Sequence, residues 1–216
     1  MIPPMKLGIV DLGISNVGSL VTAFDRLDAP SVLASRASDL HEVSAIVLPG
    51  VGAFADGMKS LRGAELVDPI RGAARDGIPI LGVCLGMQLL ARRSEEHGKH
   101  EGLGLVDGDV VRLEAGNGER VPNIGWCDIH PVDSARLFAG TSAGESFYFV
   151  HSYHLSCEEQ GLAAATMSFG GQEIVIAVEK GNIFGLQFHP EKSQDAGLTV
   201  LERFIGVVNT LDREKL

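Results

Sequence analysis

The first half of the chain alternates short continuous apolar runs with stretches in which apolar residues recur at helical spacing. Residues 6–10 form an apolar run that ends at Asp11, a pattern typical of a buried strand with a polar residue at its carboxyl end. Asn16 is suited to cap the helix that follows. By the same criteria we expect further strands at 31–34, 45–48 and 78–83, and helices at 17–27, 53–61, 65–75 and 85–93.

Strands that alternate with helices indicate a mostly parallel sheet with helices on both faces. The strand at 45–48 is followed by Pro49, Gly50, Val51 and Gly52, which we expect to form a turn because glycine and proline interrupt sheets.

The second half of the chain has a different pattern, in which strand-like runs follow one another with short turns. We expect strands at 103–113, 126–131, 146–152, 162–169, 173–179 and 183–188, and a last helix at 197–211. Antiparallel or mixed strands would therefore extend the parallel sheet. Because no repeat, linker or low-complexity segment interrupts the pattern, it favours one α/β domain over residues 1–216.

Composition narrows the class of protein. The chain is 45% apolar and 21% charged, which allows a sizeable core without metals or disulfides. Its formal net charge of −10 argues against a nucleic-acid binder, which would need a basic face to displace counterions. The most apolar stretch, 77–91, is broken by proline and glycines and is shorter than the roughly 20 residues that cross a membrane.

The three cysteines, Cys84, Cys127 and Cys157, are far apart and show no CxxC spacing. An odd and scattered set argues against a disulfide framework or a zinc site and favours a reducing compartment. Residues 1–4 are too short to be a signal peptide. We therefore expect a soluble cytoplasmic protein with no metal and no cofactor.

Cys84 stands in Gly82-Val83-Cys84-Leu85-Gly86, between a predicted strand and a predicted helix. Gly-x-Cys-x-Gly is the cysteine form of the nucleophile elbow, in which small neighbours make room for a sharp turn. The start of a helix at Leu85 would favour a thiolate, and its backbone N–H groups could stabilise an oxyanion. A cysteine at a strand end is also common as a small buried apolar residue, so the pentapeptide alone leaves both interpretations open.

A thiol nucleophile needs a base, and His189 is the best placed histidine. It ends the predicted strand 183–188, and Pro190 prevents that strand from continuing. Glu191 follows two residues later, close enough to orient the imidazole. With Cys84 these residues would supply nucleophile, base and orienting carboxylate. The alternative is a strand-end histidine that hydrogen-bonds only to the backbone.

These residues carry a resemblance to a known family. Gly82 to Gln88 together with Phe188 to Glu191 resembles the class I, or triad, glutamine amidotransferases. Further segments are similar to the glutaminase subunits of imidazole glycerol phosphate synthases, which belong to histidine biosynthesis. These segments are 48–54, 122–126, 148–153 and 185–193.

The resemblance implies a flavodoxin-like class I glutamine amidotransferase fold and an enzyme that hydrolyses glutamine. Cys84 would attack the side-chain amide to form a γ-glutamyl thioester, while His189 moves the proton and Glu191 holds His189. Backbone amides of Val51 and Leu85 would form the oxyanion hole. The residues implied to bind glutamine are Gly50, Gly52, Gln88, His151, Ser152 and Tyr153.

The resemblance also implies a partner. The ammonia would pass inside a heterodimer to a cyclase subunit with a (β/α)₈ barrel, which makes imidazole glycerol phosphate and aminoimidazole carboxamide ribonucleotide. As the glutaminase subunit of this synthase, the chain is expected to be a hydrolase and a lyase, and no nucleic acid or membrane is implied. Asn16 and Trp126 are expected at the interface, although a single tryptophan can also fill a core.

Four positions depart from the usual residues of this family. Leu12 stands where tyrosine is usual, Ser15 where glycine is, Asn123 where histidine is common, and Cys127 where asparagine is. We expect them around the docking surface, which leaves the partner open. The chain could supply ammonia to a different synthase, or be a non-catalytic docking subunit. An intact triad disfavours the second alternative, and Gln88 disfavours a general cysteine hydrolase.

Overall fold

The computed structural model describes residues 5–13, 17–116, 118–157 and 161–214. The predicted interface residue Asn16 and the departure at Ser15 lie outside these residues. None of the helices in the described ranges is both long enough and apolar enough to cross a membrane.

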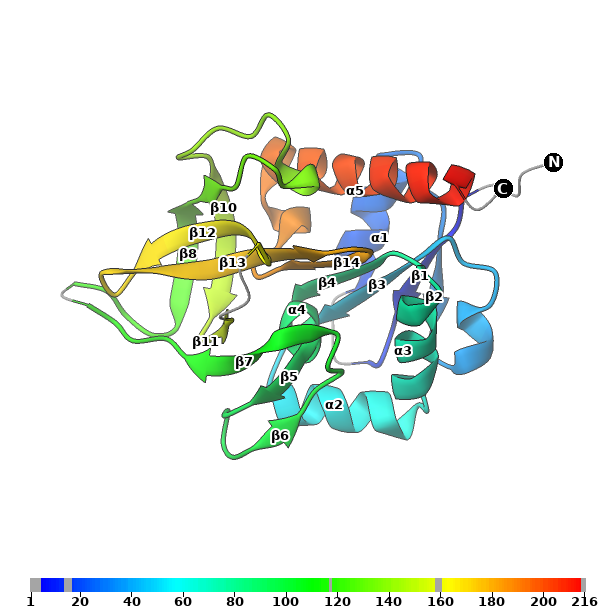
Figure 1. The fold of residues 1–216 in the computed structure, drawn as a ribbon, viewed down its shortest axis with the longest axis horizontal. Helices are drawn as coiled ribbons and strands as arrows, with labels where there is room; N and C mark the ends of the chain where they lie inside the picture. Colours follow the sequence, from blue (N-terminus) through cyan, green and yellow to red (C-terminus); the bar gives the residue numbers. More distant parts are fainter. Residues whose placement is uncertain (1–4, 14–16, 117, 158–160, 215–216) are drawn as a thin grey trace.

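Five parallel strands form one half of a mixed sheet (Figure 1). In spatial order they are β2 (Ser31–Ala34), β1 (Leu7–Val10), β3 (Ala45–Gly50), β4 (Ile80–Cys84) and β14 (Ile183–Leu186). Every residue of the four strands other than the edge strand β2 is buried. Continuous apolar runs are what strands covered on both faces require, which is why the sequence predicted this part well.

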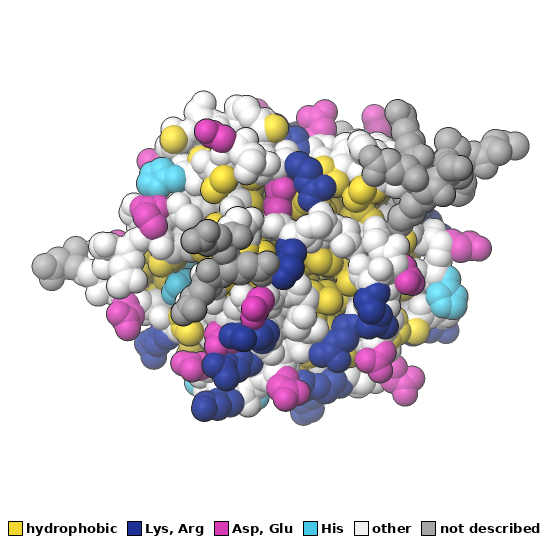
Figure 2. All heavy atoms as spheres, in the orientation of Figure 1, with side chains coloured by type: hydrophobic (Ala, Val, Ile, Leu, Met, Phe, Trp, Pro, Cys, Tyr) yellow, Lys and Arg dark blue, Asp and Glu magenta, His cyan; other side chains and the backbone are white. Residues whose placement is uncertain are grey.

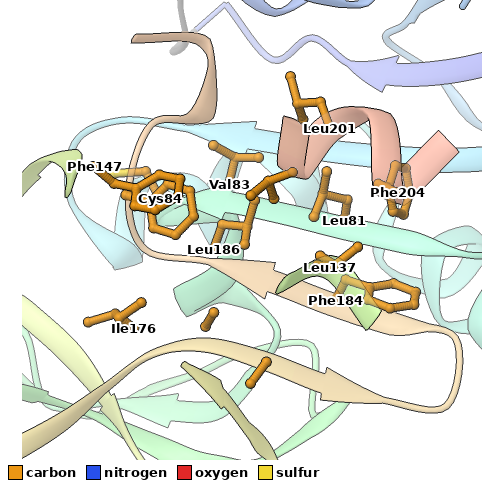
Figure 3. Close-up of a cluster of buried hydrophobic side chains, with 14 of the residues drawn as sticks. Leu81, Val83, Cys84, Leu137, Phe147, Ile176, Phe184, Leu186, Leu201 and Phe204 are labelled. Atoms are coloured by element: carbon orange, nitrogen blue, oxygen red, sulfur yellow. The ribbon is translucent and has the colours of Figure 1, made fainter. Parts of the chain in front are cut away.

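Helices cover the two faces of this parallel half (Figure 1). One face packs α1 (Val17–Asp25) and α5 (Gln194–Glu214) against apolar side chains of the sheet, and the other packs α2 (Phe54–Gly63) and α3 (Val67–Arg75). Figure 3 shows part of the first cluster, in which Leu201 and Phe204 of α5 lie over the parallel strands. The same cluster reaches Cys84.

Strands of the second half extend the sheet beyond β14. They are β13 (Gln172–Lys180), β11 (Tyr153–Ser156), β7 (Val106–Arg112), β5 (Ala91–Ser94) and β6 (His100–Glu101), with β12 (Ala163–Phe169) and β9 (His130–Pro131) branching from β13. All neighbours along this extension are antiparallel except β5 and β7. The prediction of a parallel core with added antiparallel strands is confirmed.

A separate antiparallel ribbon stands beside the sheet and consists of β8 (Asn123–Asp128) and β10 (Ser146–His151). Short helices complete the described structure: η1 (Ala37–Leu40), α4 (Leu85–Leu89), η2 (Arg136–Phe138) and η3 (Pro190–Lys192). The ribbon is tied to η3 and to α5, so it lies close to the carboxyl end of β14.

Charged side chains are mixed on the face shown in Figure 2, with Lys and Arg gathering where β5, β6, α2 and α3 lie. Arg92 and Arg93 of β5 pair with Asp109 of β7 at 3.1 and 2.6 Å. These arginines therefore have acidic neighbours and do not form an unopposed basic patch.

Several predicted boundaries were wrong, and two of them belong to segments that adjoin Cys84. β3 continues through Pro49 and Gly50, which pair in register with Val83 and Cys84. This is possible because proline loses only its own N–H, and it stands here near the strand end.

The predicted helix 85–93 ends at Leu89, and Ala91 begins β5. Backbone amides of residues 103–106 donate to the carbonyls of Leu89, Leu90 and Ala91 at 2.8–3.0 Å. These carbonyls would otherwise accept from the next helical turn. Tertiary pairing has therefore replaced a helix that local spacing favours.

Two glycines make the turn between β4 and α4 possible. A Cβ on Gly82 would lie 2.7 Å from the backbone of Gly86, and a Cβ on Gly86 would lie 1.7 Å from the carbonyl oxygen of Leu48 in β3. Both distances are far below van der Waals contact. The glycines predicted to make room for the turn are therefore required by close backbone approach.

We expect Gly86→Ala to lower the free energy of unfolding by about 3 kcal/mol or more, because the new methyl group and the Leu48 carbonyl cannot both keep their positions. Gly63→Ala is the matched control, since no atom lies within 4 Å of its Cβ position at the end of α2. Urea unfolding of both variants measures the difference, and similar stability for the two would contradict this account of the turn.

Candidate active site

Cys84 sits on a strained turn at the carboxyl end of β4. Its φ of 54° and ψ of −111° are unusual for a residue with a side chain, and the residue is only 7% exposed. Its Sγ lies 3.9 Å from the carbonyl oxygen of Val150 and 4.0 Å from Nε2 of Gln187. The strain is maintained because strand β4 and the Gly86–Leu48 contact fix the chain on both sides.

His189 and Glu191 form a buried pair next to this cysteine. Nδ1 of His189 lies 2.9 Å from Oε1 of Glu191, and the two side chains are almost fully buried, at 6% and 5% exposure. The backbone of His189 is fixed as well. Its N–H donates to the carbonyl of Tyr148 at 2.9 Å, and its carbonyl accepts from Ser193 Oγ at 2.6 Å. Ser193 also accepts from the Tyr148 N–H at 3.0 Å, so it joins η3 to β10.

The charge of His189 follows from its neighbours. Burial alone would lower the pKa of this imidazole, but hydrogen bonds and charge interactions with Cys84 and Glu191 outweigh burial and raise the pKa to about 9. A protonated His189 therefore lies beside the cysteine side chain. The helix that was expected to contribute its dipole, α4, is shorter than predicted and has only 5 residues, so its dipole is small.

Cys84 and His189 open onto one cavity of about 270 Å³. Its wall contains most of the predicted substrate and oxyanion residues, namely Val51, Gly52, Leu85, Gln88, His151, Ser152 and Tyr153. Gly50 does not line the cavity. It pairs with Cys84 in the sheet, and a Cβ there would lie 3.0 Å from the Leu85 side chain, so its place is to let Leu85 approach β3.

Four further residues line the same cavity and were not predicted from the sequence: Glu96, Pro122, Val150 and Lys192. Glu96 is the most informative, because its carboxylate accepts from the N–H of Phe54 at 2.6 Å and so is held at the start of α2. In the sequence Glu96 adjoins His97 in a charged stretch that looks like a solvated loop. Nothing in the local pattern indicates that this loop turns back towards Cys84.

His151 is a neutral histidine in the cavity wall. Nδ1 donates to the carbonyl of Tyr153 at 3.0 Å, which leaves Nε2 to accept from the amide of Asn123 at 3.2 Å. Burial lowers the pKa of His151 to about 4 against a smaller opposing effect of the Tyr153 carbonyl. Asn123, one of the four departures from the usual family residues, is itself buried, at 8% exposure, and its amide bonds to His151 in the cavity wall.

Cys127 also has a partner among these residues. Its Sγ donates to Oδ1 of Asn123 at 3.5 Å, and burial raises the pKa of the Cys127 thiol. The two departures at 123 and 127 thus contact one another. Asn123 does not lie on the exposed surface where the sequence placed it.

Trp126 is 48% exposed on β8, so it does not fill the core. Its ring meets that of Tyr148 edge to face, with centroids 5.9 Å apart. Its place in an interface stays a prediction.

The fold and the site define a class of protein. The sequence model of the family described as glutamine amidotransferase class-I matches residues 8–207, so the chain belongs to the class I glutamine amidotransferases. Solved structures share this fold at low identity. A putative GMP synthase component from Thermoplasma acidophilum has a TM-score of 0.76 at 19% identity and covers 98% of both chains. PurLQS from Thermotoga maritima has a TM-score of 0.74 at 20% identity, covering 94% of this chain and 99% of that one.

Closer similarity specifies the member of the class. Subunit HisH of imidazole glycerol phosphate synthase from Moorella thermoacetica is 42% identical over 92% of this chain and 93% of that protein. HisH from Desulfitobacterium hafniense strain Y51 is 43% identical (94% and 95% covered), and HisH from Bacillus licheniformis is 44% identical (92% and 94%). The chain belongs to this HisH family. Its members are subunits of a synthase, which implies a partner subunit.

The pH dependence of stability tests the environment of His189. Its pKa is about 9 in the folded protein, against about 6.5 for an unperturbed histidine. Since the folded-state pKa is the higher, proton binding stabilises the fold fully below about pH 6.5, and this stabilisation is lost as the pH rises to about 9. We expect the melting temperature to fall more between about pH 6 and pH 9 in the native chain than in His189→Gln.

The matched control is His97→Gln, which replaces an exposed histidine and should keep the pH dependence of the native chain. The same loss of melting temperature in all three proteins would show that His189 does not carry the raised pKa.

Proposed function

We propose that the chain hydrolyses glutamine to glutamate and ammonia at Cys84 and supplies the ammonia to a cyclase subunit in histidine biosynthesis. The observation that carries this proposal is that Cys84, on a strained and buried turn, meets His189 at the wall of one small cavity, with Glu191 bonded to His189 behind it. Membership of the HisH family supports the choice of glutamine as substrate and of a synthase as the setting.

The proposed reaction has two halves. The Cys84 sulfur attacks the side-chain carbonyl carbon of glutamine, the C–N bond breaks, and His189 gives its proton to the departing ammonia. A γ-glutamyl thioester remains. His189 then takes a proton from water, whose oxygen attacks the thioester carbon to release glutamate and the Cys84 thiolate. Backbone N–H groups of Val51 and Leu85 are the proposed donors to the oxyanion of each tetrahedral intermediate.

The cavity wall suits a free amino acid. Glu96 is fixed there by the Phe54 amide, and a held carboxylate is the natural partner of an α-ammonium group. Gln88 and the backbone at 151–153 are proposed to complete the binding of the substrate. The cavity of about 270 Å³ is small, which favours glutamine over a longer peptide.

An exposed apolar surface adjoins this cavity. Ile124 and Trp126 of β8 pair in register with Val150 and Tyr148 of β10, so the four side chains share one face of the ribbon. Ile124 is 62% exposed, Trp126 48% and Val150 37%. Val150 also lines the cavity, so the surface reaches its mouth. A partner docked here would cover the site, so that ammonia could pass to it without escaping into water.

The proposed partner is the (β/α)₈ cyclase subunit, in a heterodimer, at the surface that carries Trp126. The hydrolase activity is proposed for this chain, whereas the lyase activity expected from the sequence belongs to the cyclase. We further propose a single domain, supported by a 12-stranded sheet that runs through both halves. Cytoplasmic location stays a prediction.

We expect Cys84→Ala to abolish glutamine-dependent turnover in the complex with the cyclase but to leave ammonia-dependent turnover unchanged. The substitution removes the nucleophile, while the acceptor site lies in the partner. Glutamate release and ring-closure product are measured with glutamine or ammonium as the nitrogen source. Cys157→Ala, which changes a cysteine outside the cavity, is the control and should retain both activities.

Loss of both activities in an assembled Cys84→Ala complex would contradict the proposal. A native chain that releases glutamate with another synthase, but not with the cyclase and its nucleotide substrate, would favour the alternative that it supplies ammonia to a different synthase.

We expect Trp126→Ala to weaken the complex with the cyclase at least about tenfold, since exposed tryptophans at the centre of interfaces carry much of the binding energy. Leu33→Ala is the matched control, because Leu33 is equally exposed, at 49%, on β2, an edge strand of the large sheet and not of the ribbon. Calorimetric titration with the cyclase gives both affinities. If both substitutions weaken the complex equally, or if neither weakens it, the ribbon is excluded as the docking surface.

A further inference from the structure

Gln187 is a fully buried carboxamide next to the proposed site. It follows the end of β14, and its exposure is 0%. Its backbone N–H donates to the carbonyl of Ile176 at 2.8 Å, which continues the pairing with β13. The strand therefore fixes the backbone, and the side chain is free to serve another purpose. The side chain takes no part in the proposed reaction steps.

The Gln187 side chain bridges two residues of the cavity wall. Nε2 lies 4.0 Å from Sγ of Cys84, within reach of a hydrogen bond to sulfur. Oε1 accepts from Nε2 of Gln88 at 3.0 Å. Burying a carboxamide is costly unless its polar atoms are paired, and both pairs here are with residues of the site.

The bridge fixes the orientation of Gln88. The Nε2 group of Gln88 has two N–H bonds, one directed to Gln187 and the other to the carbonyl of Tyr153, also at 3.0 Å. With both donors engaged, only the carbonyl oxygen of Gln88 remains to meet a ligand. Gln88 lines the cavity and so offers an acceptor there, which suits a donor group of the substrate.

We propose that Gln187 is a positioning residue with two separable roles, which rest on the proposed glutaminase function. Its N–H group stabilises the negative sulfur of Cys84 and keeps it aligned. Its carbonyl oxygen holds Gln88 with an acceptor turned towards the α-ammonium group of glutamine. The first role affects the chemical step, and the second affects substrate binding.

Two substitutions separate these roles in the assembled complex with cyclase and its nucleotide. Gln187→Glu keeps an oxygen for Gln88 but places a second oxygen against the sulfur. We expect kcat for glutamine to fall at least about tenfold with KM little changed, because an N–H donor is lost. This deficit should shrink as the pH falls, since a protonated carboxyl again donates. Gln187→Met removes both interactions, and we expect KM to rise about tenfold as well.

Controls distinguish positioning from stability. Asn182→Met removes a carboxamide at the other end of β14 that donates to the carbonyls of Ala74 and Ile78, at 2.9 and 2.7 Å. It should lower the melting temperature without changing kcat or KM. In the double variant of Gln88→Ala with Gln187→Met, the rise in KM should be less than the product of the single effects. Ammonia-dependent turnover should match the native complex in every variant.

If the native complex is active on glutamine and both Gln187 variants have the same kcat and KM as the native complex, the role of Gln187 is overturned while the proposed function stands. Lowered stability with unchanged kcat and KM would overturn it in the same way. A native complex that consumes ammonia but not glutamine would overturn it together with the proposed function.

Discussion

The contact between Gly86 and the carbonyl of Leu48 is the constraint on which the site depends. It allows α4 to start directly against β3, so the chain must turn sharply at the residue between β4 and α4. That residue is Cys84, which therefore takes a backbone conformation with positive φ. Strain of this kind persists only where surrounding structure fixes it, and here two parallel strands and a buried helix do so. The position of the sulfur follows from backbone packing and not from its own interactions.

Because α4 is short, the electrostatics of the site come from side chains. A helix of 5 residues has a small dipole, whereas the protonated imidazole of His189 places a full positive charge beside the cysteine. That imidazole keeps its proton because Cys84 and the buried carboxylate of Glu191 both interact with it. The buried pair in turn needs a fixed backbone, which Ser193 supplies by joining η3 to β10. The ribbon with the exposed tryptophan and the base of the site are thus parts of one hydrogen-bonded unit.

The sequence predicts the parallel half of this fold well because buried strands and amphipathic helices each have a direct apolar pattern. It fails where distant segments decide the local conformation, as when residues 103–106 take the carbonyls that would have continued the helix after Leu89. The site follows the same rule. Cys84 and His189 are indicated by the turn and the strand end on which they stand, whereas Glu96 reaches the cavity only through a loop whose path no local signal encodes.

Residues 123 and 127, two of the positions that depart from the expected family residues, are coupled by a direct contact. Asn123 has one amide group, which it divides between donating to His151 and accepting from Cys127. Replacing either residue alone would leave a buried polar atom without its partner, which costs more than the bond itself contributes. His151 in turn donates to the carbonyl of Tyr153, and Gln88 donates to the same carbonyl. A line of hydrogen bonds therefore joins the ribbon to the nucleophile through Cys127, Asn123, His151, Tyr153, Gln88, Gln187 and Cys84. Movement of the ribbon on docking would have to be accommodated along this line, since its inner members apart from Tyr153 are buried and have little access to water that could replace a lost partner.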